Sequence, residues 1–482
     1  MKKQKGKILV LFLAVLLVSV MSCENPFLKK MLVEEETGKT VPQVPKHGVT
    51  FSVEGGHGTL KAEVDGKEIN SGDSVEQGKS VVFTAEPDPN YVVEQWANGG
   101  TVIGEAGMDT SYTYTVTANA DIKVKFQSLF IEGGASLILS PYGLNIRVKV
   151  TTADNSSVRI EGCTETELTS GTETVLHAKG TVVILKGNII ELNCDSNRLT
   201  ELNVQGLTAL ETLWCYNNWL TALNVQGLTA LERVGCSGNQ LTALNVQGCT
   251  ALKELSCRYN QLTALNVQGL NALETLWCDD NLLTALNVQG LTALQYLDCD
   301  DNLLTALNVQ GLTALKWLDC EGNQLTELNA QGCTALQRLE CYGNQLTELN
   351  VQGCTALQKL GCYNNQLTAL NVQGCTALKW LSCHNNQLTE LNVQGLTALR
   401  SLACWGNQLN AYAFKKLFDD LPARQDSDDA KCILYTEESG VTEGNHTDFT
   451  APQDLKDAFD NAKNNKKWKM YKWNGSWPGV EI

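Results

Sequence analysis

A thiol returns every 21 residues through the middle of this 482-residue chain, beginning with Cys194, Cys215 and Cys236 and ending with Cys404. Cysteines at a fixed spacing can form disulfides, bind zinc or fill a core as compact apolar side chains. Zinc sites use cysteines in C-x₂₋₄-C clusters, and the sequence has no such cluster. Eleven side chains that point in parallel are also an unsuitable set for disulfides.

A second column of positions favours core thiols. The residue after the recurring Gln-Gly is leucine six times and cysteine four times. A position that accepts either residue needs a small apolar side chain, which is the usual role of a buried free cysteine. We therefore predict reduced core thiols, with no metal and no other cofactor. The leucines are Leu207, Leu228, Leu270, Leu291, Leu312 and Leu396, and the cysteines are Cys249, Cys333, Cys354 and Cys375.

The cysteines belong to a unit that occurs eleven times over residues 189–409, and an asparagine follows each of them by three residues, from Asn197 to Asn407. The unit reads L-x-x-L-x-C-x-x-N-x-L and continues as T-x-L-N-V-Q-G-(L/C)-T-A. This resembles the leucine-rich repeat, with cysteine in place of one strand leucine. Since one unit cannot bury its own apolar side, the resemblance implies a repeat solenoid whose strands form one parallel β ribbon.

Side-chain alternation in the strand predicts which positions are displayed. Counting from the first apolar residue of a copy, which is Leu210 in the second, positions 4 and 6 face the core while 3, 5 and 7 face the open side. Copies agree in the core but differ at these three positions, where nine of 33 residues are Trp or Tyr against 7% aromatics overall. Drift at unconstrained sites would leave ordinary surface composition, so we interpret the open side as a binding face. Its predicted binding aromatics are Trp214, Tyr216, Trp277, Tyr296, Trp317, Tyr342, Tyr363, Trp380 and Trp405.

Acidic residues gather on the same face in the fifth to seventh copies, and they suit a basic protein patch. Calcium is disfavoured, because carboxylates on strands lack the wrapping loop that supplies six or more ligands. A solvated acidic stripe without function and a sugar track along the tryptophans stay open as alternatives. The predicted acidic binding residues are Asp279, Asp298, Asp300, Asp319 and Glu321.

Charge and motif content exclude two classes of function. A formal net charge of −16 disfavours a nucleic-acid partner, since phosphate binding needs clustered lysine and arginine. No G-x-S-x-G, H-E-x-x-H or Walker pattern occurs, and His384 has no nucleophile set around it in the sequence. We expect a protein that is not an enzyme.

The amino terminus has the layout of an export signal. Residues 1–7 carry four lysines, residues 8–21 are nearly all apolar, and Ser22 precedes Cys23. We predict a signal peptide at 1–22, a lipid on Cys23 and a linker at 23–47 that tethers the chain to the membrane. Plain signal-peptidase cleavage, which would leave Cys23 free, is the alternative.

Strand-like segments flank the array. Short alternating runs over 48–128 include Phe83-Thr-Ala-Glu-Pro87 and Tyr91-Val-Val-Glu-Gln-Trp96, which resemble the divergent B repeat of internalin-type surface proteins, with Tyr91 and Trp96 in its core. Residues 129–188 continue the alternation and are predicted to cap the array, with Cys163 as a small buried hydrophobe. Helical spacing before Pro422 and the strand-like run 467–473 predict an α+β cap over 410–482.

This combination of export signal, Cys23, B-repeat-like module and cysteine-bearing array resembles surface leucine-rich-repeat lipoproteins of host-associated bacteria and, more distantly, internalins. The resemblance implies an exported outer-membrane or cell-surface lipoprotein that adheres to a protein of a host cell, a matrix or another bacterium. A glycan- or peptidoglycan-binding module and a structural envelope protein remain the alternatives.

Overall fold

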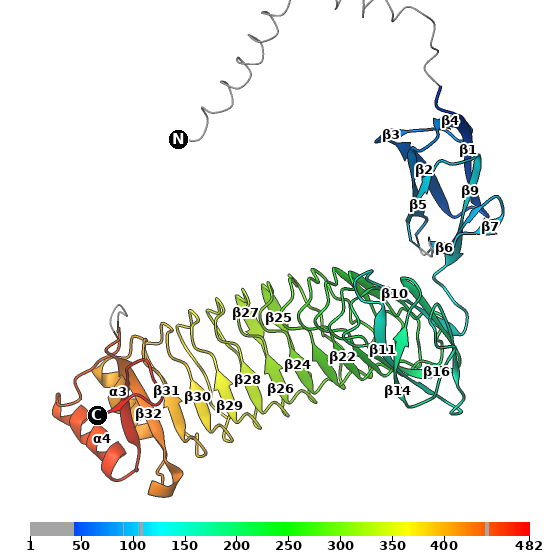
Figure 1. The fold of residues 1–482 in the computed structure, drawn as a ribbon. Coiled ribbons are helices and arrows are strands. Elements are labelled where there is room, and N and C mark those ends of the chain that lie inside the picture. Colours follow the sequence, from blue (N-terminus) through cyan, green and yellow to red (C-terminus); the bar gives the residue numbers. More distant parts are fainter. Residues whose placement is uncertain (1–42, 90, 105, 107–108, 439–442) are drawn as a thin grey trace, which may run out of the picture. The chain divides into compact units, whose positions relative to one another are not determined.

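The computed structural model describes residues 43–482 except 90, 105, 107–108 and 439–442 (Figure 1). The predicted signal peptide, Cys23 and most of the predicted linker lie outside the described residues. Within the described ranges, no helix is long and apolar enough to cross a membrane.

Residues 46–128 form two β-sheets, with strand orders β4-β1-β9-β6-β7 and β3-β2-β5-β8. Trp96 is fully buried and its indole Nε1 donates to the Asp109 carbonyl at 2.8 Å, as expected of a core residue. Tyr91 is only half-buried and stacks on His57. The strands are β1 (Lys46–Glu54), β2 (Gly58–Val64), β3 (Lys67–Glu68), β4 (Asp73–Glu76), β5 (Ser80–Pro87), β6 (Tyr91–Asn98), β7 (Thr101–Val102), β8 (Ser111–Thr115) and β9 (Ala120–Ser128).

The next six strands extend the first copy of the array on both of its sides. β11 pairs antiparallel with β16 (Ile189–Asn193), and β10 pairs antiparallel with β17 (Leu199–Asn203). One apolar cluster runs without a break from Ala135 to Met470 and includes Cys163, which is buried as expected. The six strands are β10 (Gly134–Leu139), β11 (Asn145–Thr152), β12 (Val158–Glu161), β13 (Glu167–Leu168), β14 (Glu173–His177) and β15 (Val182–Lys186).

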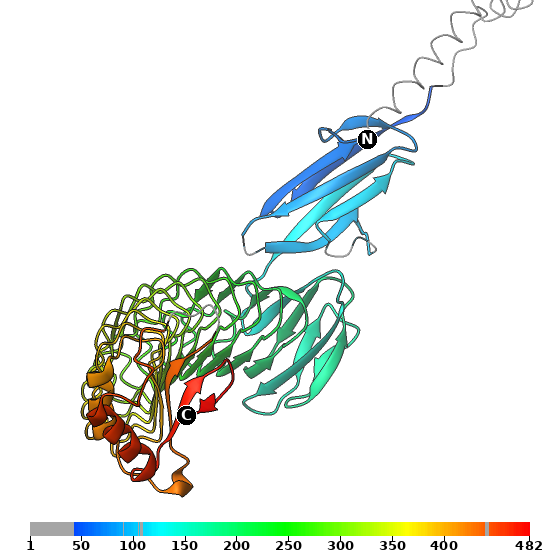
Figure 2. The ribbon, with the colours of Figure 1, turned by 90° about the vertical axis from the view of Figure 1, so that its left-hand side faces the viewer.

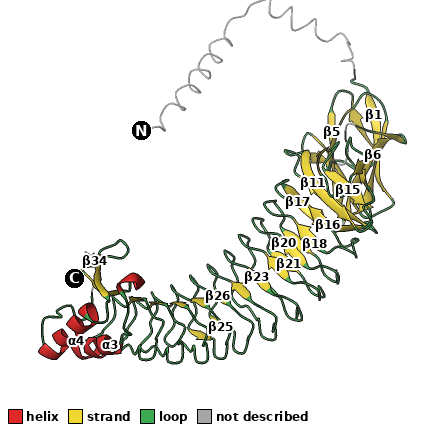
Figure 3. Cartoon of the chain, turned by 90° about the horizontal axis from the view of Figure 1, so that it is seen from below, coloured by secondary structure: helices red, strands yellow, loops and turns green. Residues whose placement is uncertain are grey.

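The array is the predicted solenoid, with one short strand of each copy added in register to a 16-stranded sheet (Figures 1 and 3). In this sheet positions 3 to 5 of each later copy pair as strand, and the chain turns at the asparagine of position 9. Positions 4 and 6 are buried throughout, so the predicted direction of the core is confirmed. The strands are β18 (Thr212–Trp214), β20 (Arg233–Gly235), β22 (Glu254–Ser256), β23 (Thr275–Trp277), β24 (Tyr296–Asp298), β26 (Trp317–Asp319), β28 (Arg338–Glu340), β29 (Lys359–Gly361), β30 (Trp380–Ser382) and β31 (Ser401–Ala403).

Positions 13 to 15 form two further parallel pairs on another side of the coils. β19 (Ala222–Asn224) pairs with β21 (Ala243–Asn245), and β25 (Ala306–Asn308) pairs with β27 (Glu327–Asn329).

The asparagine column ties each coil to the one before it. Asn302 Nδ2 donates to the carbonyls of Cys278, at 3.0 Å, and Cys299, at 3.3 Å, and its Oδ1 accepts from the Leu283 amide at 2.9 Å. Most copies repeat this pattern. Because a buried backbone group without a partner costs roughly 1–3 kcal/mol, the ladder explains why asparagine is kept at position 9.

All described cysteines are free and buried. Burial raises the pKa of Cys236 to about 12 and that of Cys375 to about 11, so these thiols stay protonated at neutral pH. In the main column the sulfur lies near the carbonyl of the next strand, as for Cys299 Sγ and the Asp319 oxygen at 3.4 Å. The thiols therefore serve as packing groups with weak donor contacts.

The last copy is covered by helices and three strands (Figure 2). Asn410 caps the first helix by accepting from the Ala413 amide at 2.9 Å. Trp468 is 1% exposed and donates to the Pro422 carbonyl, which places it in the core of the cap. The elements are α3 (Ala411–Asp420), β32 (Lys431–Thr436), α4 (Gln453–Asn464), β33 (Lys469–Trp473) and β34 (Val480–Glu481), with β32 parallel to β31.

Candidate binding site

The open face displays aromatic rings mainly at position 3. Tyr296 is 38% exposed, Trp317 39% and Trp380 45%. These are high exposed fractions for large aromatic side chains. Single exposed hydrophobes are ordinary, but three on one column of one sheet face form a surface that a partner can bury.

An aromatic hollow of about 510 Å³ lies between the fourth and seventh copies. Trp277, Tyr296 and Trp317 form its walls, and the buried Leu297 contributes to its lining. The hollow exists because the rings stand on successive strands while their neighbours Thr275 and Asp298 are short. The other lining residues are Arg258, Thr275 and Asp298.

Arg258 fixes one wall of the aromatic hollow. Its guanidinium lies 5.6 Å from the centre of the Trp277 ring, donates through Nε to Asp279 and donates through Nη2 to Asp298 Oδ2 at 2.5 Å. This contact buries Asp279, which is only 3% exposed. The expectation that Asp279 is displayed to a partner is therefore wrong, because an arginine from the preceding copy covers it.

The predicted acidic residues form a group next to the hollow, which we call the acidic column. Its members are Asp279, Asp298, Asp300, Asp319 and Glu321. One carboxylate oxygen each from Asp279, Asp298 and Asp300 lies within 4.8 Å of the others. Burial, a hydrogen bond with Asp298 and the negative charges nearby raise the pKa of Asp300 above its usual range. Burial and the charges of Glu321 and Asp298 raise the pKa of Asp319 to about 7. Carboxyls of this column therefore bind protons near neutral pH, because Arg258 balances the charges of the cluster only in part.

Beyond the acidic column, basic residues neutralise the face locally. Glu340 is 3% exposed and is held by Arg338 Nε at 3.1 Å and Lys359 Nζ at 2.7 Å. The Arg338 guanidinium also lies 4.5 Å from the centre of the Trp317 ring, and Lys379 Nζ lies 5.9 Å from that of Trp380. This part of the face therefore differs from the fifth to seventh copies, because its buried carboxylate, Glu340, is neutralised by two cations.

Position 7 of the last four copies forms an aromatic stack of Tyr342, Tyr363, His384 and Trp405, which Trp473 of β33 extends. Successive ring centres are 4.2, 4.3, 4.5 and 5.6 Å apart. Burial lowers the pKa of His384 to about 4, so it is neutral in the stack. Trp405 is only 8% exposed, because Ile433, Tyr471 and Trp473 of the carboxyl-terminal cap pack around it. The expectation that Trp405 is displayed is wrong.

In the second copy, Trp214 and Tyr216 stack on each other at 5.6 Å and both are half-buried. Gly235 of the next copy makes room for them, since a Cβ there would meet the Tyr216 ring at 2.1 Å. These two aromatics form a separate cluster, which the structure does not bring together with the hollow.

Three exposed residues that the sequence analysis did not single out lie in the turns that follow the strands of the fourth to sixth copies, and we call them the rim. Tyr259 is 61% exposed, Leu282 45% and Leu303 38%. Tyr259 has φ +52°, in the left-handed region that a bulky side chain rarely adopts. The sequence did carry a signal, since the equivalent position is otherwise Gly, Asn, Asp or Ser, and that of the leucines is Gln in seven copies.

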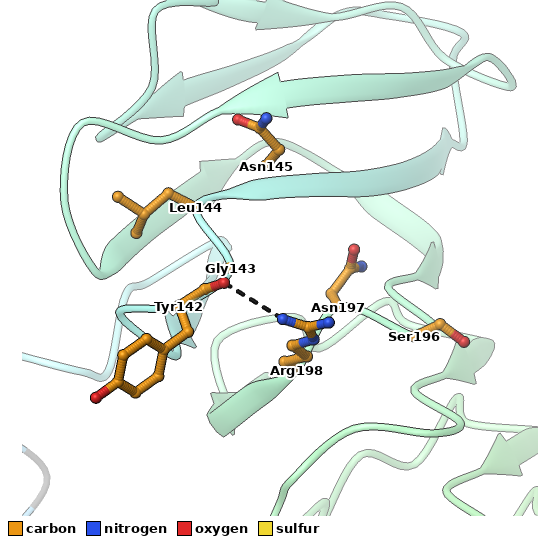
Figure 4. A pocket seen from close by; sticks show the side chains of 7 residues that line it. All are labelled: Tyr142, Gly143, Leu144, Asn145, Ser196, Asn197 and Arg198. Carbon is orange, nitrogen blue, oxygen red and sulfur yellow. Dashed lines mark hydrogen bonds between the residues drawn. The ribbon is translucent and has the colours of Figure 1, made fainter.

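A second hollow of about 420 Å³ lies where the first copy meets the preceding strands (Figure 4). Arg198 Nη1 donates to the Tyr142 carbonyl across it at 3.3 Å. Asn197 beside it belongs to the asparagine column and accepts from the Arg147 amide. Its polar lining is thus used in holding the first copy to the strands before it.

Comparisons with known proteins agree with one part of the sequence analysis. Residues 49–129 match the family model of the divergent InlB B-repeat domain, which confirms the resemblance stated for 48–128. A comparison with curated proteins found no match.

Solved structures with a similar fold include the functional domain of InlJ from Listeria monocytogenes, described as including a cysteine ladder, at 24% identity and TM-score 0.39, covering 60% of this chain and 74% of that one. A leucine-rich-repeat protein of Leptospira interrogans has 23% identity and TM-score 0.41, with 58% and 82% covered. The internalin InlF from Listeria monocytogenes has 20% identity and TM-score 0.44, with 59% and 80% covered.

Proposed function

We propose that the chain is a binding protein of the cell surface that grips a protein partner with the open face of its array. The observation that carries this proposal is the aromatic hollow of Trp277, Tyr296 and Trp317. Trp and Tyr are enriched where partners dock, and they contribute most when they stand on a rigid element. Here in-register strands fix the backbone of all three rings.

The dimensions of the face favour a macromolecule. Eleven strands at ~4.8 Å spacing give a surface roughly 50 Å long, which is ample for a standard protein interface. The aromatic hollow is open to this surface, so it suits one side chain of a larger partner.

Cations already cover the tryptophans, and this favours a protein over a sugar. Arg258, Arg338 and Lys379 lie over Trp277, Trp317 and Trp380 respectively. A sugar would need a free ring face to stack on, whereas a protein partner can pack against ring edges and the arginine stems together. We therefore keep glycan binding as the second candidate.

Surface location is part of the same proposal and rests on the amino-terminal residues. A basic segment, an apolar run and Cys23 suit export followed by lipid attachment, and the B-repeat-like module suits a stalk between anchor and array. The proposal includes no catalysis, because His384 lies between Tyr363 and Trp405 and its neighbour Cys383 is fully buried.

Binding arrays test this function. The full chain is applied to an array of purified proteins and to a glycan array, next to a variant with Trp277→Ala, Trp317→Ala and Trp380→Ala. The matched control replaces three exposed threonines outside the open face, Thr263, Thr284 and Thr305, by alanine.

We expect protein ligands whose affinity drops about tenfold or more in the tryptophan variant and stays unchanged in the threonine control. Circular dichroism must show both variants folded. Ligands that bind the tryptophan variant equally well, or binding to sugars alone, would contradict the proposal.

A further inference from the structure

The aromatic hollow has one lining group whose bonding is incomplete. Asp298 Oδ2 accepts from Arg258, but Asp298 Oδ1 is buried and accepts from no N–H or hydroxyl group of the described residues. The donor beside Asp298 is the carboxyl of Asp300, which can donate only while it holds a proton. Asp300 and Asp319, which lie beside Asp298 in space and on the next strand, take part in no ion pair among the described residues. A buried carboxylate oxygen without a donor is costly, so the free chain satisfies this end of the hollow only while Asp300 holds a proton, which a cationic side chain could replace as the donor.

The rim of Tyr259, Leu282 and Leu303 adjoins the aromatic hollow at Tyr259, because Arg258 lines the hollow. Tyr259 follows Arg258 directly in the chain, and the charges of Asp280 and Asp279 raise the pKa of its phenol, which reflects their closeness. A tyrosine in the left-handed region is strained, and Asn or Gly would relieve that strain. Strain of this kind, with an exposed ring as its result, points to a use of that ring outside the fold.

We infer that the fourth to seventh copies hold one docking footprint for a basic protein segment. In this footprint a lysine or arginine side chain enters the aromatic hollow toward Asp298, and an adjacent apolar side chain rests on Tyr259, Leu282 and Leu303. The inference rests on the proposed function and deepens it, since it names the chemistry of the partner and confines the footprint to part of the face.

Three properties of the hollow select a basic side chain. The Tyr296 ring attracts a cation. Arg258 and Arg338 lie over the faces of Trp277 and Trp317, so these two rings offer their apolar edges to the alkyl stem of lysine or arginine. Asp298 Oδ1 supplies an acceptor for a charge-assisted hydrogen bond. Because crowding raises the pKa of both Asp300 and Asp319, these carboxyls bind protons near neutral pH, and a cation that enters the hollow favours their ionised forms.

The eighth to eleventh copies lack these properties. Glu340 is already paired with two cations, and the rings of Tyr342, Tyr363, His384 and Trp405 cover one another. A basic segment therefore has little to gain there.

Peptide titrations test the inference with the full chain. The probe is a fluorescein-labelled, unstructured peptide of alternating lysine and leucine, and its partner probe is the same peptide with every lysine acetylated. Fluorescence anisotropy gives both dissociation constants at low and at physiological salt. We expect acetylation to weaken binding at least tenfold, and salt to weaken the lysine peptide alone.

Matched variants locate the footprint. We expect Trp317→Ala and Asp298→Asn each to weaken the lysine peptide about tenfold. Trp219→Ala is the control. Trp219 is 40% exposed and lies under Arg198, much as Trp317 is 39% exposed and lies under Arg338, but Trp219 belongs to the second copy, outside the fourth to seventh copies. Equal losses in Trp219→Ala and Trp317→Ala would overturn the inference, as would equal binding of the acetylated peptide.

Replacing each rim residue by one that other copies carry at its repeat position distinguishes an effect on binding from an effect on folding. Tyr259→Asn, and Leu282→Gln with Leu303→Gln, introduce side chains that other copies carry at these positions. We expect Tyr259→Asn to raise the melting temperature and still weaken the peptide severalfold, a combination that a merely structural tyrosine would not give. Unchanged peptide binding in both rim variants would remove the rim from the footprint and contradict the inference.

Failure of this inference is distinguishable from failure of the proposed function. A protein ligand from the array that depends on Trp380 but not on Trp317 would leave the open face as a binding surface and overturn the basic footprint. Calcium at millimolar concentration displacing the lysine peptide through Asp298 and Asp300 would assign the acidic column to a metal, and would also overturn it.

Discussion

The fifth to seventh copies and the eighth to eleventh copies share one scaffold, but the side chains on their open faces differ. In the later copies, position 7 carries rings that stack on one another and on Trp473 of the cap. In the earlier copies, the same position carries Asp279, Asp300 and Glu321, and burial together with neighbouring carboxylates raises the pKa of each. The comparison shows two uses of the variable positions in a repeat array. Their side chains can pack on one another, or they can stay without a packing partner and so remain available to a bound protein.

The largest expected effect tests whether the scaffold is the same in both regions. Asn302→Ala and Asn386→Ala each remove an amide that donates to carbonyls of its own and the preceding coil and accepts a leucine amide. Because several buried backbone groups lose their partners, we expect each variant to lose about 4 kcal/mol in denaturant unfolding. A loss in one region only would show that the two scaffolds differ.

The next effect separates a ring that packs from a ring that is displayed. Trp405→Ala removes a ring that is 8% exposed and stacks between His384 and Trp473, so we expect it to cost about 3 kcal/mol and to leave peptide binding unchanged. Trp317→Ala removes a ring that is 39% exposed, so its cost in denaturant unfolding should stay below about 1 kcal/mol. Similar losses of stability in the two variants would erase the distinction between the regions.

The acidic column lowers the stability of the earlier copies as the pH rises from about 4 to about 7. The folded state holds the Asp319 proton up to about pH 7 while the unfolded chain releases it near the ordinary value of 3.8, so stability falls as pH rises through that window. Asp319→Asn removes this loss. We expect the variant to melt above the parent chain at pH 8 and the difference to shrink toward pH 4, measured by thermal scans in matched buffers.

The aromatic stack gives the later copies the opposite and smaller dependence. Since the pKa of His384 is lowered to about 4, the unfolded chain binds its proton more readily between pH 6.5 and 4, and stability falls as pH falls through that window. His384→Phe keeps an aromatic ring in the stack without the ionisable group. The variant should gain relative to the parent as pH drops from 7 to 4.5, and a constant difference would mean that His384 is not desolvated.

The repeat pattern predicted the solenoid and the direction of its side chains, because both follow from alternation along a strand and from stacking of equal units. It predicted Tyr296, Trp317 and Trp380 on the surface for the same reason. It could not predict the burial of Asp279, which depends on how far the Arg258 side chain reaches into the following copy.

The other differences arise where the repeat ends or where one copy departs from its column. Trp405 is covered because β33 is added at the end of the sheet and its Tyr471 and Trp473 pack on the Trp405 ring. The repeat pattern of the array does not predict the position of that strand. Tyr259, Leu282 and Leu303 stand at positions whose other residues suit a turn, so only a column-by-column reading of the turn would have found them.

Fluorine NMR of the full chain labelled with 5-fluorotryptophan tests the central claim most directly, because each tryptophan reports on its own surroundings while the lysine peptide is added. Single Trp→Phe variants assign the signals. The account predicts that the Trp277 and Trp317 signals shift together with peptide concentration, while those of Trp219 and the buried Trp468 stay fixed. Unchanged Trp277 and Trp317 signals under conditions where the peptide binds would contradict it.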